Sequence, residues 1–279
     1  MRKLKVYYAN ISNMGDRLNE LILSGCFGYK MERHSVLTGE LSAIGSGLDM
    51  FTLHGTTLMR MQQRLYGALM PRIAVWGTGF LNYASGAERF FRKMDFFAVR
   101  GELSRKRVER ITGLSLKIPT GDAGLLCTEL IEERKAGRGR LCIVPHVCDL
   151  RLDNLEQLLS GCGEYEMIDV RDEPIGVLRQ IASCSYVLSS SLHGLVVADA
   201  FGIPNRHILL SDKPKGDGFK FDDYYSSYGV EHVVTDLRTE PPPSKAEIEA
   251  GYLISSSAVE EKRRSLRECF PFDAERVRT

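Results

Sequence analysis

The sequence predicts an α/β protein of two domains, with a charged helical tail that packs back across them. Short apolar runs alternate with longer segments of helical character, which is the pattern of strand–helix units around parallel sheets. The 279 residues are enough for two modest domains. The charged linker at residues 132–140 is the one clear change of composition. We therefore expect domains over residues 1–135 and 136–245, followed by a tail over 246–279.

Apolar runs ending in glycine-containing turns define the strands of the first domain. A polar loop and an amphipathic helix through Leu18 and Ile22 follow the first strand, and a basic helix surrounds Arg105–Arg110. Another strand is expected to end at Gly121. The other predicted strands cover residues 3–8, 41–45, 73–76 and 96–99.

The second domain repeats the same alternation. Helices are predicted at 174–181 and 192–201, and a charged helical tail at 244–269 follows Pro241–Pro243. The predicted strands cover residues 141–144, 166–170, 186–189, 206–210 and 232–236.

Composition excludes several classes of protein. With 37 Lys and Arg against 36 Asp and Glu, the net charge of +1 gives no electrostatic case for a nucleic-acid partner. No apolar run approaches the ~18–20 residues of a transmembrane helix, and no signal peptide is evident, so we expect a cytoplasmic protein. The odd number of cysteines, without a CxxC pair, favours free structural thiols and no metal site. These are Cys26, Cys127, Cys142, Cys148, Cys162, Cys184 and Cys269.

Glycine-containing turns after predicted strands are candidate ligand sites, because helix N-termini and strand ends expose N–H groups there. In Asn13-Met-Gly-Asp16, Gly15 permits a tight turn, and Asp16 either caps the helix or accepts a proton. Gly77-Thr78-Gly79 and Gly45–Gly47 lack the third glycine of a dinucleotide fingerprint, so they give little support to a nicotinamide or flavin site.

A strand that ends in serines and runs into an apolar helix is the strongest local signal. Ser190 or Ser191 would cap this helix, and His193 lies in its first turn beside free N–H groups that suit an anion. A buried histidine that holds a neighbouring loop is the alternative. The expected contact set here is Ser189, Ser190, Ser191, His193 and Gly194.

Four cationic or titratable residues follow strands or lie in polar loops. Arg100 follows a strand, where a guanidinium can hold a carboxylate or phosphate through two hydrogen bonds. His146 also follows a strand, whereas Lys213 and Lys220 are expected in polar loops. Surface ion pairs, loop packing and solvated lysines are the alternatives for these residues.

Four motifs then occur in order between about residues 10 and 230. They are Asn13-Met-Gly-Asp16; Val99-Arg-Gly-Glu-Leu-Ser104 with Gly121-Asp122-Ala123 beyond it; Ser190-Ser-Leu-His-Gly-Leu195 continuing to Ala200–Pro204; and Lys220–Tyr224 continuing to Gly229. Together they resemble the polysaccharide pyruvyl transferase family. One departure is Ser191, which stands where many members have arginine.

The resemblance implies two Rossmann-like domains that face a cleft, as in GT-B glycosyltransferases, with a C-terminal helix reaching back. It also implies transfer of the enolpyruvyl carbons of phosphoenolpyruvate, as co-substrate, to a glycan sugar, without cofactor or metal. Protonated His193 would give a proton to C3, Arg100 and Lys220 (or Lys213) would hold the anionic groups, and Asp16 would be the base. The implied substrate contacts are Asn13, Gly15, Gly77, Thr78, Gly79, His146, Ser189, Ser190, Ser191, Gly194 and Lys213.

Two other functions remain open. A nucleotide-sugar glycosyltransferase would need an acidic residue for the donor ribose, for which Asp217, Asp222 and Asp223 are available. A non-catalytic glycan- or anion-binding protein would keep only the cleft. The acceptor sugar is also open. A lipid-linked acceptor would imply peripheral contact with the inner membrane face, but the sequence shows no obvious basic amphipathic helix.

Overall fold

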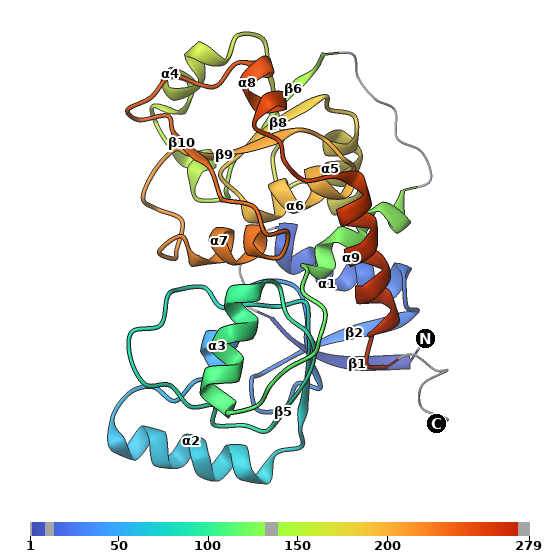
Figure 1. Cartoon of the computed structure of the whole chain (residues 1–279), viewed down its shortest axis with the longest axis vertical. Helices are drawn as coiled ribbons and strands as arrows, with labels where there is room; N and C mark the ends of the chain where they lie inside the picture. Colours follow the sequence, from blue (N-terminus) through green and yellow to red (C-terminus); the bar gives the residue numbers. More distant parts are fainter. Residues whose placement is uncertain (1, 9–13, 132–138, 273–279) are drawn as a thin grey trace.

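The computed structural model describes residues 2–8, 14–131 and 139–272. It contains two five-stranded sheets, which lie one above the other in Figure 1. All strands of the first sheet come from the first half of the chain (residues 2–131), and all strands of the second come from the second half (residues 139–272). Every strand pairing is parallel, so the predicted α/β class with two parallel sheets is confirmed.

The first sheet has the order β2-β1-β3-β4-β5. Its strand β4 consists of four buried apolar residues, as expected for a strand covered on both faces. The strands are β1 (Arg2–Tyr7), β2 (Tyr29–His34), β3 (Leu41–Ser42), β4 (Ile73–Trp76) and β5 (Met94–Ala98); the helices are α1 (Met14–Gly25), α2 (Thr57–Leu69) and α3 (Glu102–Thr112).

The second sheet has the order β10-β9-β8-β6-β7. Its strands are β6 (Leu141–Val144), β7 (Glu166–Met167), β8 (Tyr186–Ser189), β9 (Asn205–Leu209) and β10 (Val234–Asp236). Four helices accompany them: α4 (Leu155–Leu159), α5 (Pro174–Ala182), α6 (Leu192–Ala200) and α7 (Phe219–Ser226). The strands β6 and β8 begin and end at the predicted residues.

Two local predictions are wrong. The segment before Gly121 forms no strand, and only a single bridge joins Thr120 to Val99. Lys220 lies in α7 rather than in a loop, because Phe219 and Phe221 are buried and draw this segment into helical packing. The strand β2 and the helix α2 were not predicted: β2 alternates few apolar residues with charged ones, and Gly67 is the one buried residue of α2.

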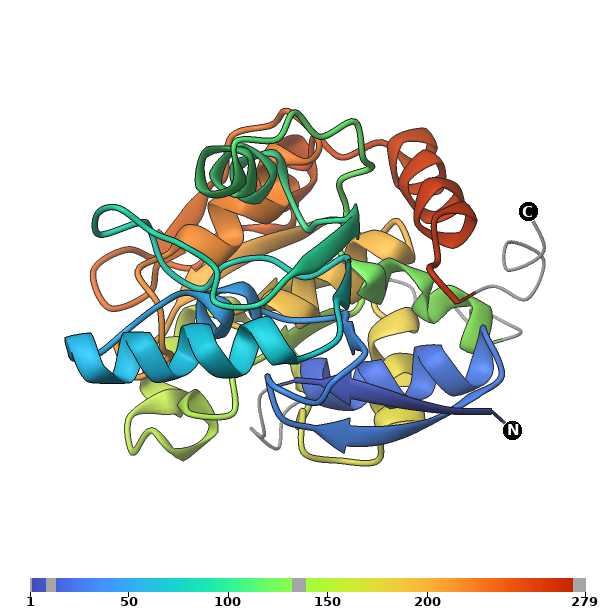
Figure 2. The same ribbon diagram turned by 90° about the horizontal axis from the view of Figure 1, so that it is seen from below.

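The two halves meet where helices and loops leave the ends of the strands of each sheet (Figures 1 and 2). A single cluster of buried side chains runs from Val6 on β1, through Leu18 on α1 and Leu126 on the 3-10 segment η2 (Ala123–Leu130), to Val196 on α6 and Val144 on β6. Packed side chains therefore join the two halves at α1, η2 and α6.

The tail forms two helices, α8 (Lys245–Ala250) and α9 (Ser256–Glu268), rather than one. Helix α8 packs on β8 and β9, whereas α9 runs back beside the first half (Figure 1). Trp76 Nε1 on β4 donates a hydrogen bond of 2.8 Å to the carbonyl of Leu266 on α9, and the Phe270 ring lies 5.0 Å from the Trp76 ring. The tail thus packs across both halves, as the sequence predicts.

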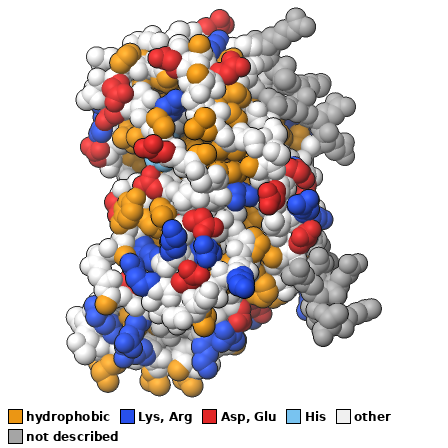
Figure 3. All heavy atoms as spheres, in the orientation of Figure 1, with side chains coloured by type: hydrophobic (Ala, Val, Ile, Leu, Met, Phe, Trp, Pro, Cys, Tyr) orange, Lys and Arg blue, Asp and Glu red, His pale blue; other side chains and the backbone are white. Residues whose placement is uncertain are grey.

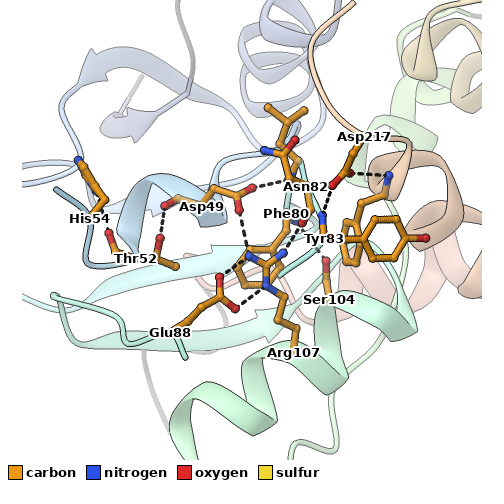
Figure 4. A network of polar contacts seen from close by, with 12 residues as sticks. Asp49, Thr52, His54, Phe80, Asn82, Tyr83, Glu88, Ser104, Arg107 and Asp217 are labelled. Atoms are coloured by element: carbon orange, nitrogen blue, oxygen red, sulfur yellow. Dashed lines mark hydrogen bonds and ion pairs between the residues drawn. The ribbon is translucent and has the colours of Figure 1, made fainter. Parts of the chain in front are cut away.

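Arg107 on α3 anchors the loop that follows β4 (Figure 4). Its guanidinium lies 3.8 Å from the centre of the Phe80 ring and pairs with Glu88. The same loop reaches the second half, where the backbone N–H of Tyr83 donates to Asp217 Oδ2 at 2.7 Å. These contacts position the turn at residues 77–79.

The cysteine prediction is wrong for one pair. Cys142 on β6 and Cys184 after α5 form a disulfide, with Cα atoms 6.0 Å apart. The pair is 42 residues apart in the chain, so no local spacing could reveal it. The other five cysteines are free thiols, as expected.

Candidate active site

His193 lies where the N-termini of two helices meet. Helix α6 is apolar and almost entirely buried, so it holds this residue firmly in its first turn, where the ring is 14 % exposed. Gly15 in the first turn of α1 packs against the ring, and a Cβ at Gly15 would overlap Nδ1. The site therefore requires glycine at this position, and it joins α1 of the first half to α6 of the second.

Asp122 faces the other side of the His193 ring. Its Oδ1 caps η2 by accepting the N–H of Gly124 at 2.8 Å. Its Oδ2 lies 3.9 Å from His193 Nε2. Both of these atoms are buried, and neither has a hydrogen-bond partner among the described residues. Buried polar atoms are rarely left unpartnered, so the pair is poised for a ligand or for a shared proton.

Burial favours the neutral forms of both His193 and Asp122. Burial, with Arg100, Lys220 and His146 adding to it, lowers the pKa of His193 to about 3. Burial raises the pKa of Asp122 to about 6, against the opposing effects of the Gly124 N–H and Arg100. At neutral pH the imidazole of the free protein is therefore uncharged. Burial first, and then the neighbouring cations, disfavour a proton on His193 in the free protein, so its role as an acid stays a prediction for the complex with the donor.

Lys220 supplies a second positive charge that acts on His193. Burial, and then the charge of Arg100, lowers its pKa to about 8. Within the described residues its ammonium has no ion pair or hydrogen bond, and it lies 5.1 Å from the centre of the Phe221 ring. Burial and Lys220 also lower the pKa of His146. Positive charge therefore gathers around His193, where a bound anion would offset it.

Lys213, the alternative lysine, lies elsewhere. It is exposed and lines a surface pocket of about 960 Å³ together with Asp212 and Arg238. Of the two candidate lysines, Lys220 is the one whose charge acts on His193.

Arg100 is completely buried in an ion pair that joins the two halves. Its Nε donates to Asp223 Oδ2 on α7 at 3.0 Å, and its Nη1 donates to Ser46 Oγ at 2.7 Å. Ser104 Oγ donates to the same Asp223 oxygen at 2.6 Å, and Phe80 O accepts from Nη2. These protein acceptors hold the guanidinium in place, so a direct contact with substrate stays a prediction, whereas its charge already acts on His193.

The serines before α6 fix the strand ends to one another. Ser189 Oγ donates to Val144 O on β6 at 2.6 Å. Ser190 Oγ donates to Asp149 Oδ2 at 2.5 Å and accepts the N–H of His146 at 2.9 Å. These two hydroxyls hold the loop after β6 beside α6 and thereby position His146.

Ser191 and Gly194 flank His193 at the start of α6. Ser191 occupies the N-cap position of α6, but its side chain makes no capping hydrogen bond, so the expected serine cap is absent. Gly194 lies against Ser189, and a Cβ there would overlap Ser189 Oγ. Its direct contact with substrate stays a prediction.

The turn at residues 77–79 is a scaffold for the first half. Gly77 has φ of +80°, and a Cβ at this position would overlap Ala123. Thr78 Oγ1 donates to the carbonyl of Gly45 at 2.9 Å, and Gly79 packs against the Arg100 guanidinium. The turn thus supports both Arg100 and the segment that carries Asp122.

Two predicted residues cannot be placed in this geometry. Asn13 lies outside the described residues. Asp16 belongs to the first turn of α1, but its side chain lies outside the described part of the structure. Their roles stay predictions.

The carboxylates that a nucleotide-sugar enzyme would need are engaged by protein donors. Asp223 holds Arg100, and Asp217 accepts the N–H of Tyr83. Asp222 lies 2.7 Å from His232 Nδ1 and accepts the hydroxyl of Tyr83 at 2.5 Å. This geometry gives no support to a ribose contact by any of the three.

Sequence reasoning missed two acidic residues of the site. Asp122 belongs to Gly121-Asp122-Ala123 of the second motif, and this place could have marked it as functional. Asp149 accepts hydrogen bonds from Ser190 and Ser211, and no local pattern in the sequence signals that role.

These features define the class of protein. It is an α/β protein with a polar, cation-rich site where segments from two parallel sheets meet. The sequence matches the polysaccharide pyruvyl transferase family over residues 43–212, more than half of the chain, and the chain belongs to this family. The matched segment contains Arg100, Asp122 and His193, whereas Gly15 and Lys220 lie outside it.

Two curated relatives match the chain over part of their length. An uncharacterized protein of Acanthamoeba polyphaga mimivirus is 30% identical over 162 residues, covering 56% of this chain and 55% of the relative. The succinoglycan biosynthesis protein ExoV of Rhizobium meliloti (strain 1021) is 26% identical over 180 residues, covering 63% and 54%. The chain thus spans about half the length of these relatives. The solved E. coli heptosyltransferase WaaC with ADP aligns over 96% of this chain and 99% of its own, but at 14% identity and a TM-score of 0.27 it carries no argument.

Proposed function

We propose that this chain transfers the enolpyruvyl carbons of phosphoenolpyruvate to two hydroxyls of a glycan sugar, giving a cyclic pyruvate ketal and inorganic phosphate. The observation that carries the proposal is the buried, unpartnered pair of His193 Nε2 and Asp122 Oδ2, 3.9 Å apart. An acid of this kind, surrounded by cations, suits a small ligand of high negative charge. We place the donor between the two halves, in a GT-B-like arrangement, and the enzyme in the cytoplasm.

The charge of the donor explains how a neutral imidazole becomes an acid. Burial, and then the charges of Arg100 and Lys220, lower the pKa of His193 in the free protein. Phosphoenolpyruvate brings a carboxylate and a phosphate, which offset both cations, so the pKa of His193 rises and the ring takes up a proton. The carboxylate of Asp122 then orients and stabilises the imidazolium.

In the proposed reaction, His193 is the only group that donates a proton to a carbon atom. His193 gives its proton to C3, and the double-bond electrons form the new C–H bond. A sugar hydroxyl attacks C2 and releases its proton to a base, for which Asp16 is our candidate. The bond between C2 and the phosphate oxygen then breaks, and a second hydroxyl adds to C2. Of the two hydroxyl protons, one restores the acid and the other leaves with the phosphate or solvent.

Substitution of His193 tests the proposal. We expect His193→Gln to lower phosphate release from phosphoenolpyruvate, across a panel of glycan acceptors, by ~10²–10⁴-fold. In D₂O the wild-type product should carry one deuterium in its methyl group. His34→Gln, at the end of the edge strand β2, is the matched control and should retain activity. Near-normal release by His193→Gln, or a methyl group without deuterium, would contradict the assignment.

Proton uptake on binding tests the electrostatic step separately. Titration calorimetry with phosphoenolpyruvate at pH 7, in buffers of different ionisation enthalpy, should show uptake of about one proton by the wild type and less by His193→Gln. Lys220→Met should weaken binding, whereas Lys213→Met should not. Equal effects of the two lysine substitutions would refute the placement of the donor.

Two outcomes would favour other functions. Saturation-transfer NMR signals from UDP- or GDP-sugars, but none from phosphoenolpyruvate, would indicate a glycosyltransferase. Phosphoenolpyruvate binding without phosphate release for any acceptor would indicate a non-catalytic binding protein.

A further inference from the structure

Helix α2 turns its apolar side away from the protein. Leu58, Met61, Leu65 and Leu69 are between 62 % and 70 % exposed. Their spacing of three, four and four residues places them on one helical face. In Figure 1 the helix lies at the end of the molecule remote from the second sheet. Large apolar side chains gathered in one exposed stripe mark a surface that is covered in function.

The opposite face of α2 is fixed to the body of the protein. Gly67 is the one buried residue of the helix, and a Cβ there would overlap the carbonyl oxygen of Phe91. Gln63 Oε1 accepts the N–H of His54 at 3.1 Å, on the same side of the helix. The close approach at Gly67 prevents the helix from rotating. Helix α2 thus turns its apolar face outward, whereas a helix that packs on a protein core turns its apolar face inward.

Basic residues surround the stripe. No acidic residue occurs in the sequence between Asp49 and Glu88. Figure 3 shows hydrophobic side chains along the lower edge of the molecule, where α2 lies, with basic side chains around them. Four exposed basic residues lie on α2 or in the segment between β4 and β5, and none of them has an ion pair within the described residues. They are Arg60, Arg64, Arg89 and Lys93.

We propose that α2 docks on the surface of an anionic phospholipid bilayer. The helix lies parallel to the surface, with the stripe of Leu58, Met61, Leu65 and Leu69 in the apolar boundary region and the basic side chains among the headgroups. No helix of the described chain is long and apolar enough to cross a bilayer. The proposal does not depend on the reaction at His193.

The sequence shows no obvious basic amphipathic helix, and the outward apolar face of α2 becomes visible only in the structure. In the sequence, the segment of α2 does not reveal which of its faces turns inward. Gly67 settles this, because only that position allows the close contact with Phe91.

Charge favours a bilayer over a second copy of the chain. A two-fold contact between α2 helices would bring Arg60 and Arg64 of each copy together, and residues 50–87 offer no acidic residue to pair with them. Anionic headgroups complement this charge and accept the apolar stripe at the same time.

Vesicle flotation tests the proposal. The full chain is mixed with phosphatidylcholine vesicles, with or without phosphatidylglycerol, at low and high salt. We expect wild type to float with the anionic vesicles, and to bind weakly to the neutral ones and at high salt. The triple variant Leu58→Gln, Leu65→Gln and Leu69→Gln should lose at least about tenfold in partitioning.

Matched variants separate docking from folding. Leu114→Gln with Leu253→Gln alters leucines that are 54 % and 67 % exposed outside α2, and it should bind as wild type does. Thermal unfolding followed by circular dichroism verifies that every variant folds. Arg64→Gln should weaken binding to anionic vesicles only.

Three results would overturn the proposal. One is equal flotation of wild type and the triple variant. Another is binding that ignores phosphatidylglycerol and salt. The third is a dimer of wild type, detected by sedimentation without vesicles, that the triple variant abolishes, which would assign the stripe to a second copy.

Discussion

Asp199, on the last turn of α6, is a second buried carboxyl group close to the site. It accepts hydrogen bonds from Asn205 Nδ2 at 2.6 Å and from the hydroxyl of Tyr224 at 2.8 Å. Burial raises its pKa to about 7, although both hydrogen bonds act in the opposite direction. The folded protein therefore holds this proton at pH values where the unfolded chain has released it.

This linkage predicts a pH-dependent stability. Because the folded pKa is raised, the contribution of Asp199 is fully present below about pH 4 and is lost as pH rises through about 7. Asp199→Asn cannot ionise. The unfolding free energy of wild type relative to this variant should therefore fall by about 1.4 kcal/mol per pH unit across that window. Urea unfolding at several pH values measures it. Asp212→Asn, at a carboxylate 90 % exposed, is the control, and parallel curves for wild type and Asp199→Asn would contradict the prediction.

At the scale of elements, the ion pair of Arg100 and Asp223 joins the loop after β5 to α7. Both side chains are 0 % exposed, and the carboxylate also accepts from Ser104. Arg72 and Asp95 form a geometrically similar pair at 2.6 Å, but they are about half exposed. Solvent screens the second pair, whereas the loss of one partner in the first leaves an uncompensated buried charge.

Removal of the Asp223 carboxylate should therefore lower the free energy of unfolding more than removal of the Asp95 carboxylate. Asp223→Ala should lower the free energy of unfolding by about 3–5 kcal/mol, because it strands the Arg100 guanidinium. Asp95→Ala should remain close to wild type. Chemical denaturation of both variants provides the comparison, and similar losses from the two substitutions would show that burial does not control the strength of the pair.

At the scale of the whole molecule, α9 and the residues after it complete the core of the first half. Phe270 is fully buried between Phe27, 3.8 Å from its ring centre, and Trp76. Trp76 is the single tryptophan of the chain, so its fluorescence reports directly on this contact.

Truncation of Phe270 should weaken the whole fold. Phe270→Ala leaves a cavity beside Trp76 and should cost about 3–5 kcal/mol of unfolding free energy. Because buried side chains are continuous between the halves, tryptophan fluorescence and circular dichroism should change together in one transition. Phe272→Ala, at a half-buried ring, should cost less. Separate transitions by the two probes would show that the halves unfold independently.

The sequence predicted what depends on local pattern. Continuous apolar runs located β4, β6 and β8, and the serine run located the start of α6. It could not predict contacts made by tertiary packing. Asp122 lies beside His193 although 71 positions separate them in the chain (193 − 122). Cys142 and Cys184 likewise meet only because neighbouring strands bring them together.

Helix α7 carries both a cation that acts on His193 and one partner of the ion pair that joins the two halves. Lys220, whose ammonium has no protein partner among the described residues, lies one turn before Asp223, which holds Arg100. Any movement that separates this ion pair also withdraws the ammonium from His193. Under the proposed function, an anion that attracts both Lys220 and Arg100 would favour the arrangement with the ion pair intact, so donor binding and the contact between the halves would be coupled.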